Sequence, residues 1–230
     1  MTNPDAAKQL ATVLNKAGPI LLDFDGPVTS LLPTPANAML ADMARRPLTK
    51  AGVSLPGDIA RTSDHLAVLR FSGDLRPDLT SRVDTVCTAG EIEAAGRSTP
   101  TLGAHDAMRT LRRTGHPIVI VSNNATEAVE TYLNRHRLDE LVSGIVGRQH
   151  GQPELMKPDP EPIERALRTL GVDAASCVLI GDSVTDIEAS KAVGLRSIGY
   201  AKTPERSAEL SEAGADAVVD AMSALIAALT

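Results

Sequence analysis

The chain alternates short apolar runs with helix-like segments over most of its 230 residues, and this alternation limits the folds that it can adopt. Apolar runs of strand length occur at six places, namely residues 19–24, 117–121, 141–146, 177–180, 195–200 and 217–219. Helical patterns lie between most of these runs. The order predicts an α/β fold whose core is a doubly wound, Rossmann-like parallel sheet with helices on both faces.

One region interrupts the alternation. Residues 31–98 contain helical stretches but no strand pattern, and Gly and Pro in "DGPVTS" and "GRSTPTLG" mark turns at both edges. We therefore expect an α/β core made of residues 1–30 and 99–230, with a small all-α cap domain at residues 31–98. The first eighteen residues predict an amphipathic helix that places Leu10, Val13 and Leu14 on one face.

Composition and charge argue against several classes of partner. The net charge is −6, and the chain has two Phe, two Tyr and no Trp, whereas nucleic-acid sites favour basic grooves and stacking aromatics. Membrane surfaces are disfavoured for the same reason. Because no long apolar segment and no secretory signal pattern occur, we expect a cytoplasmic protein. Cys87 and Cys177 have neither zinc nor disulfide-framework spacing.

Two acids end the first apolar run. Asp23 and Asp25 follow "PILL", at the predicted carboxyl end of a parallel strand. In open α/β sheets this end of the strands borders the crevice where ligands bind. Alternation along an extended chain puts both side chains on one side. The alternative is that Asp25 only begins a turn with Gly26.

Polar side chains also end the second run, in "IVIVSNNATE". Ser122 and Asn123 precede a predicted helix, whose free N–H groups favour an anion. An alternative explains the residue types by helix capping, with Asn124 as the cap and Glu127 answering it three residues later.

Two further motifs carry charge. Lys157 lies in the proline-rich loop "LMKPDPEPI", and a compact ammonium suits phosphate. Asp182 ends the fourth apolar run, and Asp186 follows it by one helical turn. Asp186 could instead be a first-turn acid, and Thr185 with Glu188 could form a capping box. Neither alternative explains Asp182.

Taken together, the strand ends carry carboxylates that repel one another unless a cation lies among them. Oxygen ligands with positions left for water suit Mg²⁺, which binds one or two carboxylates together with phosphate oxygens. A lysine and Mg²⁺ in one crevice predict a site for phosphoryl transfer on a small phosphorylated metabolite.

The motifs also resemble a known family. "LLDFDGPVT", "VIVSNN", "MKPDPEPI" and "VLIGDSVTDIEASKAVGL", in this order and with a helical insert after the first, are similar to the haloacid dehalogenase superfamily. The resemblance covers nearly the whole chain from Pro19 onward. It is strongest to phosphatases with a helical cap between the first and second motifs, of the phosphoglycolate phosphatase type.

This resemblance implies a role for each acid. Asp23 corresponds to the nucleophile that becomes an aspartyl phosphate, and Asp25 to the general acid and base. The carboxylate of Asp23, the main-chain carbonyl of Asp25 and the acid Asp182 correspond to the Mg²⁺ ligands, with Asp186 helping through water. Since dehalogenases of the family lack the second acid, its presence indicates a phosphatase.

The resemblance assigns Ser122 and Asn123 to the phosphoryl oxygens, and Lys157 to the charge that develops there. It implies an enzyme that hydrolyses a small phosphate monoester with Mg²⁺, as a monomer or homodimer. The cap would set substrate choice, and Arg45, Arg46, Arg61 and Arg70 could bind a substrate carboxylate. Two alternatives stay open: a phosphomutase of the same superfamily, and a non-catalytic phospho-receiver or binding module.

Overall fold

The computed structural model describes residues 4–229, and its centre is a parallel sheet of six strands in the order β5-β4-β1-β6-β7-β8. The strands are β1 (Ile20–Leu22), β4 (Ile118–Ala125), β5 (Gly144–Arg148), β6 (Val178–Gly181), β7 (Arg196–Tyr200) and β8 (Ala217–Val219). Each of the six predicted apolar runs therefore overlaps a strand. The third begins later than predicted, because Asp139–Leu141 form a 3₁₀ turn.

The register of the central strand brings three chain segments to one edge of the sheet. Leu22 in β1 lies opposite Ile120 in β4 and Ile180 in β6, and all three strands run in the same direction. The strand order reverses at β1, since the chain later adds β4 on one side and β6 on the other. In such sheets the crevice at this point, beyond the carboxyl ends, is the usual place for a ligand.

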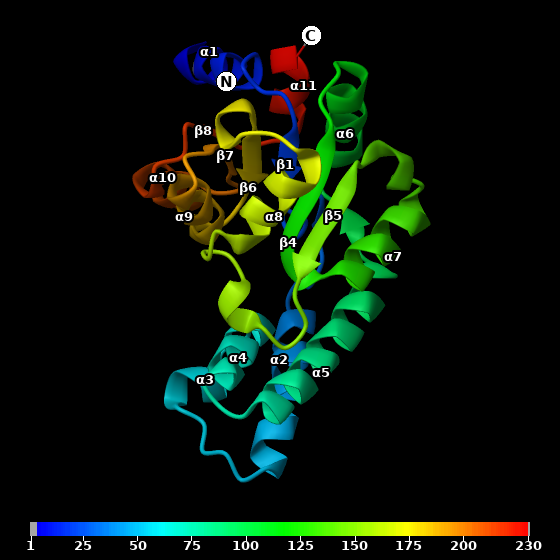
Figure 1. The fold of residues 1–230 in the computed structure, drawn as a ribbon, viewed down its shortest axis with the longest axis vertical. Helices are drawn as coiled ribbons and strands as arrows, with labels where there is room; N and C mark the ends of the chain where they lie inside the picture. Colours follow the sequence, from blue (N-terminus) through cyan, green and yellow to red (C-terminus); the bar gives the residue numbers. More distant parts are fainter. Residues whose placement is uncertain (1–3, 230) are drawn as a thin grey trace.

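Helices cover both faces of the sheet, which confirms the doubly wound α/β fold (Figure 1). Alternate residues of β1 supply the two cores: Ile20 and Leu22 belong to one apolar cluster and Leu21 to the other. The first cluster includes residues from α1 (Pro4–Leu14), α6 (Ala104–Arg113), α7 (Thr126–His136) and α11 (Ser223–Leu229). The second includes residues from α8 (Glu161–Leu170) and α9 (Val184–Ala192). Helix α10 (Pro204–Ala213) packs beside β7 and β8.

The expected N-terminal helix is α1, and its residues Leu10, Val13 and Leu14 are buried as predicted. It lies beside α11, so the two ends of the chain meet on one side of the molecule (Figure 1). Residues 1–3, for which the sequence predicted the start of this helix, lie outside the described residues. Of the described helices, none combines the length and the apolar character that a membrane crossing requires.

Residues 31–98, which we call the insert, hold four helices at the end of the molecule opposite the chain termini (Figure 1). These are α2 (Ala36–Lys50), α3 (Gly57–Arg61), α4 (His65–Gly73) and α5 (Pro77–Ala95). The sequence did not separate α3 from α4, where the Asp64 side chain accepts from Leu66 N and starts the second helix. The insert has its own apolar cluster, which includes Leu48, Leu69 and Val83. The division of the chain into two domains at its edges stays a prediction.

Two short strands that the sequence did not predict flank the insert. β2 (Thr29–Ser30) and β3 (Thr99–Pro100) pair antiparallel at the place where the chain leaves the core and returns to it. The Thr29 hydroxyl donates to Thr99 O at 2.8 Å, and the Thr101 hydroxyl donates to Gly26 O at 2.6 Å. Both crossings of the chain are thereby joined next to the end of β1.

Candidate active site

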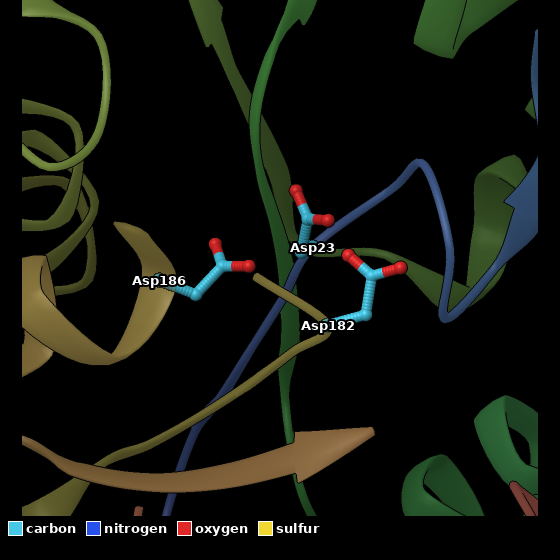
Figure 2. Close-up of side chains that lie close together, drawn as sticks. All are labelled: Asp23, Asp182 and Asp186. Atoms are coloured by element: carbon cyan, nitrogen blue, oxygen red, sulfur yellow. The ribbon is translucent and has the colours of Figure 1, made fainter. Parts of the chain in front are cut away.

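Three carboxyl groups converge beyond the carboxyl ends of β1 and β6. One ligand oxygen each of Asp23, Asp182 and Asp186 lies within 4.8 Å of the others (Figure 2). Asp23 directly follows β1, Asp182 directly follows β6, and Asp186 lies in the first turn of α9. The structure thus brings together three of the four acids for which the sequence predicted a metal site.

Glycines make room for these acids. A Cβ atom added to Gly26, which has a φ of +120°, would lie 2.0 Å from Asp182 Oδ2. A Cβ atom at Gly181 would lie 2.4 Å from Asp186 Cγ. Gly26 also has a backbone conformation that L side chains rarely adopt. The DFDG and IGDS motifs therefore need glycine because carboxylates pack directly against their main chain.

Lys157 supplies the positive charge of this site. Its Nζ donates to Asp23 Oδ1 and to Val121 O, both at 2.8 Å, and lies 2.6 Å from Asp186 Oδ1 in an ion pair. The side chain is buried. Burial lowers the pKa of Lys157, but the carboxylates of Asp186 and Asp23 outweigh it and hold the pKa above its usual range. The group is therefore a permanent ammonium beside Asp23.

The acids are poorly stabilised as anions by the protein alone. Burial raises the pKa of Asp23 well above its usual range, and Asp186 and Asp182 add to this effect against Lys157. Burial, with Asp186 and Asp25, raises the pKa of Asp182 to about 7. Asp186 Oδ1 is buried, and the partner that the structure gives it is the Lys157 ammonium at 2.6 Å. Three carboxyl groups that converge on one space with a single ammonium between them form a set of hard oxygen donors that fits a divalent cation such as Mg²⁺.

Asp25 lies beside the three-acid cluster and its side chain is not part of it. Its Oδ1 accepts from Leu31 N at 2.9 Å, so the insert's first residue holds the carboxyl group in place. Burial raises the pKa of Asp25 despite this hydrogen bond. A raised pKa is what a general acid needs near neutral pH.

The side chain of Asn123 binds the main chain of Lys157. Its Nδ2 donates to Lys157 O at 3.0 Å, and its Oδ1 accepts from Lys157 N at 2.8 Å. The Asn123 side chain thus has a supporting role, in which it fixes the backbone that carries the ammonium. The predicted contact of Asn123 with a phosphoryl group stays a prediction.

Ser122 is buried within β4, next to this pair of hydrogen bonds. Its hydroxyl donates to Asn124 Oδ1 and accepts from Asn124 N, both at 3.1 Å. The proposed cap at Asn124 is wrong, because α7 has Ala125 in the capping position and Asn124 lies within β4. The Asn124 side chain instead faces Ser122 and, through Nδ2, Glu91 at 3.2 Å.

The second capping alternative is also wrong. The box at the start of α9 pairs Ser183 with Asp186, in place of the expected Thr185 and Glu188. Asp186 Oδ2 accepts from Ser183 N at 3.1 Å and from its hydroxyl at 2.7 Å. The capping box thus orients Asp186 and leaves Oδ1 facing Lys157.

Sequence reasoning missed a buried ionic network next to the site. The Arg148 guanidinium, at the end of β5, contacts Glu91 Oε1 at 2.9 Å and Asp84 Oδ1 at 2.7 Å, both on the insert helix α5. His65, on α4, lies 2.8 Å from Glu91 Oε1 through Nε2. Asp84 and Glu91 are seven residues apart, about two helical turns, and that spacing in a helix was the only signal available.

With this geometry in place, comparison with known proteins identifies the family. Residues 20–194 match the haloacid dehalogenase-like hydrolases. The chain belongs to this family. It is 34% identical over 237 residues to a plasmid-encoded phosphoglycolate phosphatase of Cupriavidus necator, with 96% of each chain covered. It is also 32% identical over 104 residues to the pyrophosphatase PpaX of Halalkalibacterium halodurans. This match covers 44% of this chain and 47% of that protein.

Among solved structures, this haloacid dehalogenase-like hydrolase is similar to CbbY of Rhodobacter sphaeroides in complex with phosphate. The TM-score is 0.66 at 19% identity, and the match covers 93% of this chain and 99% of CbbY, which supports the fold. The family and the full-length relative make the protein a phosphoric monoester hydrolase, which confirms the enzyme class and the family predicted from the motifs.

Proposed function

We propose that this hydrolase removes the phosphoryl group from a small phosphate monoester, with Mg²⁺ bound, through an aspartyl phosphate on Asp23. The observation that carries the proposal is the convergence of Asp23, Asp182 and Asp186 on one space beside the ammonium of Lys157. Since the full-length relative is named a phosphoglycolate phosphatase, 2-phosphoglycolate is the first substrate to test.

In the first step a carboxylate oxygen of Asp23 attacks phosphorus, and the ester P–O bond breaks. Asp25, whose pKa burial raises, gives its proton to the departing alkoxide. The Lys157 ammonium lies beside Asp23, where it stabilises the negative charge on the phosphoryl oxygens. The Ser122 hydroxyl and the main chain of Asn123 would bind those oxygens.

In the second step Asp25, now ionised, takes a proton from water. The resulting hydroxide attacks phosphorus, the bond to Asp23 breaks, and inorganic phosphate leaves. Asp23, Asp182 and Asp186 would hold Mg²⁺, together with the Asp25 carbonyl. When bound, the ion neutralises charge on the carboxylates and on the phosphoryl group. Splitting one displacement into two lets a single carboxylate perform a reaction that is very slow in water.

We further propose that residues 31–98 act as a cap over a core of residues 1–30 and 99–230. The Asp25 carboxyl accepts from the insert residue Leu31, so the insert is joined to the reaction centre. Four arginines of the insert were predicted as candidates to bind a substrate carboxylate. One of them, Arg70, donates to Lys157 O at 3.0 Å and so lies beside the candidate active site. Arg45 is buried and donates to Ile59 O and Thr62 O within the insert.

The remaining expectations belong to the same proposal. A small phosphorylated metabolite is the expected partner, with no nucleic acid and no membrane, and the protein would act in the cytoplasm as a monomer or homodimer. The net charge of −6 supports the expectation of no nucleic acid. Because the overall field repels an anionic substrate, local cations such as Lys157 must attract it.

The test is turnover by the purified protein with 2-phosphoglycolate, p-nitrophenyl phosphate, a panel of sugar phosphates and pyrophosphate, each with Mg²⁺ and with EDTA. We expect phosphate release that EDTA abolishes, fastest with a small monoester. Absence of metal-dependent release from every monoester would overturn the proposal. Release from pyrophosphate alone would point to the substrate for which the partly matching relative PpaX is named.

A further inference from the structure

The insert helix α5 carries a carboxylate, Glu91, that is fully buried against the core. Glu91 has no role in the reaction steps proposed above. It contacts β4 and β5 of the core and helix α4 of the insert. Its Oε1 contacts Arg148 at 2.9 Å and His65 at 2.8 Å. Its Oε2 accepts from Ala125 N at 2.9 Å. A charge placed this deep, with this many partners, has a defined geometry.

Two hydrogen bonds to Glu91 hold the segment Ser122–Ala125. Asn124 Nδ2 donates to Glu91 Oε1 at 3.2 Å, and the Ala125 main chain donates to Oε2. Burial raises the pKa of Glu91, but Arg148 and His65 outweigh it and lower the pKa to about 2. The carboxylate is therefore ionised and only accepts hydrogen bonds.

Because Glu91 only accepts, it decides which way the Asn124 amide faces. The NH₂ group must face Glu91, so the amide oxygen faces Ser122 and accepts from its hydroxyl at 3.1 Å. Asn124 N donates to the same hydroxyl oxygen and keeps it in place. An anionic phosphoryl oxygen is a stronger acceptor than an amide, so the hydroxyl proton turns to the phosphoryl group when one binds.

Arg148 makes this buried anion possible. It contacts Glu91 through two nitrogens and donates to Asn123 O at 2.7 Å, so one guanidinium joins the insert to the same segment of the core. Its other carboxylate partner, Asp84, is equally buried on α5. Asp84 accepts from Arg148 and from Gly151 N, and none of its contacts involves Ser122–Ala125.

We propose that Glu91 is a positioning residue of the phosphoryl site: from the insert, it fixes the Ser122–Ala125 segment through Asn124 and the Ala125 main chain. The inference rests on the proposed function, because it assigns Ser122 to phosphoryl binding. It means that the insert takes part in building the phosphate site in addition to covering it.

Asp84 provides a matched control, since both acids are buried on α5 and both pair with Arg148. In Glu91→Gln one acceptor oxygen becomes an NH₂ group that faces donors, so one anchor of the segment is lost. Asp84→Asn perturbs the same ionic network, and Asp84 reaches the segment only through Arg148, which donates to Asn123 O. If Glu91 served only the ion pair, the two variants would behave alike.

The experiment measures binding of inorganic phosphate with Mg²⁺ by calorimetry, kcat/KM for the best ester, and the melting temperature of the full chain. We expect Glu91→Gln to weaken phosphate binding and to lower kcat/KM by about 10- to 100-fold. Asp84→Asn is expected to lower the melting temperature and to change both other quantities much less than Glu91→Gln does, because Asp84 has no direct bond to the segment. Equal losses in the two variants, or unchanged phosphate binding in Glu91→Gln, would overturn the inference.

Asn124→Ala keeps the inference testable if Glu91→Gln does not fold, because it breaks the same connection and spares the ion pair. It should reproduce the loss of phosphate affinity, and adding Glu91→Gln to it should cost little more. Full phosphate affinity in Asn124→Ala would contradict the inference. A wild-type protein that binds phosphate but hydrolyses no ester would refute the proposed function and leave these comparisons valid. A wild-type protein that does not bind phosphate would overturn both.

Discussion

Lys157 Nζ lies 2.8 Å from Asp23 Oδ1, although the two residues are 134 positions apart in the chain. The same ammonium lies 2.6 Å from Asp186 Oδ1. One buried cation thus pairs with two of the three clustered acids. Asn123 binds the Lys157 main chain at both its N–H and its C=O, and this explains how a loop residue holds such a position. The charge balance of the site depends on this lysine as long as no metal ion is bound.

Replacing Lys157 with Met is expected to destabilise the metal-free protein. Removing one partner of a buried ion pair costs about 3–5 kcal/mol when the other charge stays unpaired, and protonation of the acids will recover part of that. Mg²⁺ should then raise the melting temperature more than it does in the wild type, because the ion supplies the missing positive charge. Thermal unfolding with and without Mg²⁺ checks this. Lys191→Met, at an exposed position on α9, serves as the control, and equal melting temperatures in the two variants without metal would contradict the prediction.

Asp23→Asn is expected to lower kcat by several orders of magnitude, since an amide does not form the aspartyl phosphate. The fold should be retained, because the change removes one of three mutually repelling carboxylates and Lys157 keeps Asp186 as a partner. Steady-state kinetics and circular dichroism measure the two effects. Turnover within tenfold of the wild type in a folded variant would refute the assignment of the nucleophile.

Gly26→Ala is expected to abolish metal binding and activity. The new Cβ would lie 2.0 Å from Asp182 Oδ2, so the acid must leave its position. Gly171→Ala is the control, because Gly171 also has a positive φ, of +66°, but the Cβ that alanine adds there would meet no atom within 4 Å. Both variants adopt an unfavourable backbone conformation, which typically costs about 1 kcal/mol or more, and only the first disturbs the site. The Mg²⁺-dependent shift in melting temperature distinguishes them, and equal shifts would count against the prediction.

Acid should remove the stabilisation that Glu91 provides. Its pKa is lowered from 4.5 to about 2 in the folded protein, chiefly by Arg148 acting against burial. A lowered folded-state pKa contributes stability that is complete above about pH 4.5 and is lost as the pH falls towards 2. The contribution is on the order of 3 kcal/mol. Urea unfolding of the wild type and Glu91→Gln across this range should show their difference shrinking on acidification. A constant difference would show that Glu91 has an ordinary pKa.

Much of the site was predictable because its acids follow apolar runs. Asp23 and Asp182 directly follow buried strands, and Ser122 follows the apolar half of β4. Parallel strands place their carboxyl ends at one edge of a sheet. Once the strands are recognised, the proximity of these residues follows from the topology. The positions of the six sheet strands along the chain were equally predictable, because buried parallel strands leave continuous apolar runs.

Sequence patterns did not reveal which polar groups pair across the fold. Asn124 looks like a helix cap and is a link between Glu91 and Ser122, and no pattern showed that the Asn123 side chain fixes the main chain of Lys157. Both interpretations agree with the residue types, since an amide suits many partners. Only the positions of the neighbouring segments decide between them.

The amino-acid sequence by itself determined the α/β fold, the family and the edge of the sheet at which the chemistry lies, because local apolar periodicity and motif order encode these features. The tertiary structure alone decided that an insert carboxylate, Glu91, meets Arg148 from the core, 57 positions along the chain. A hydrogen bond or ion pair needs two groups from different segments about 3 Å apart, with a tolerance of a few tenths of an ångström. Such distances are set by the packing of the whole molecule and leave no periodic trace in the order of residues.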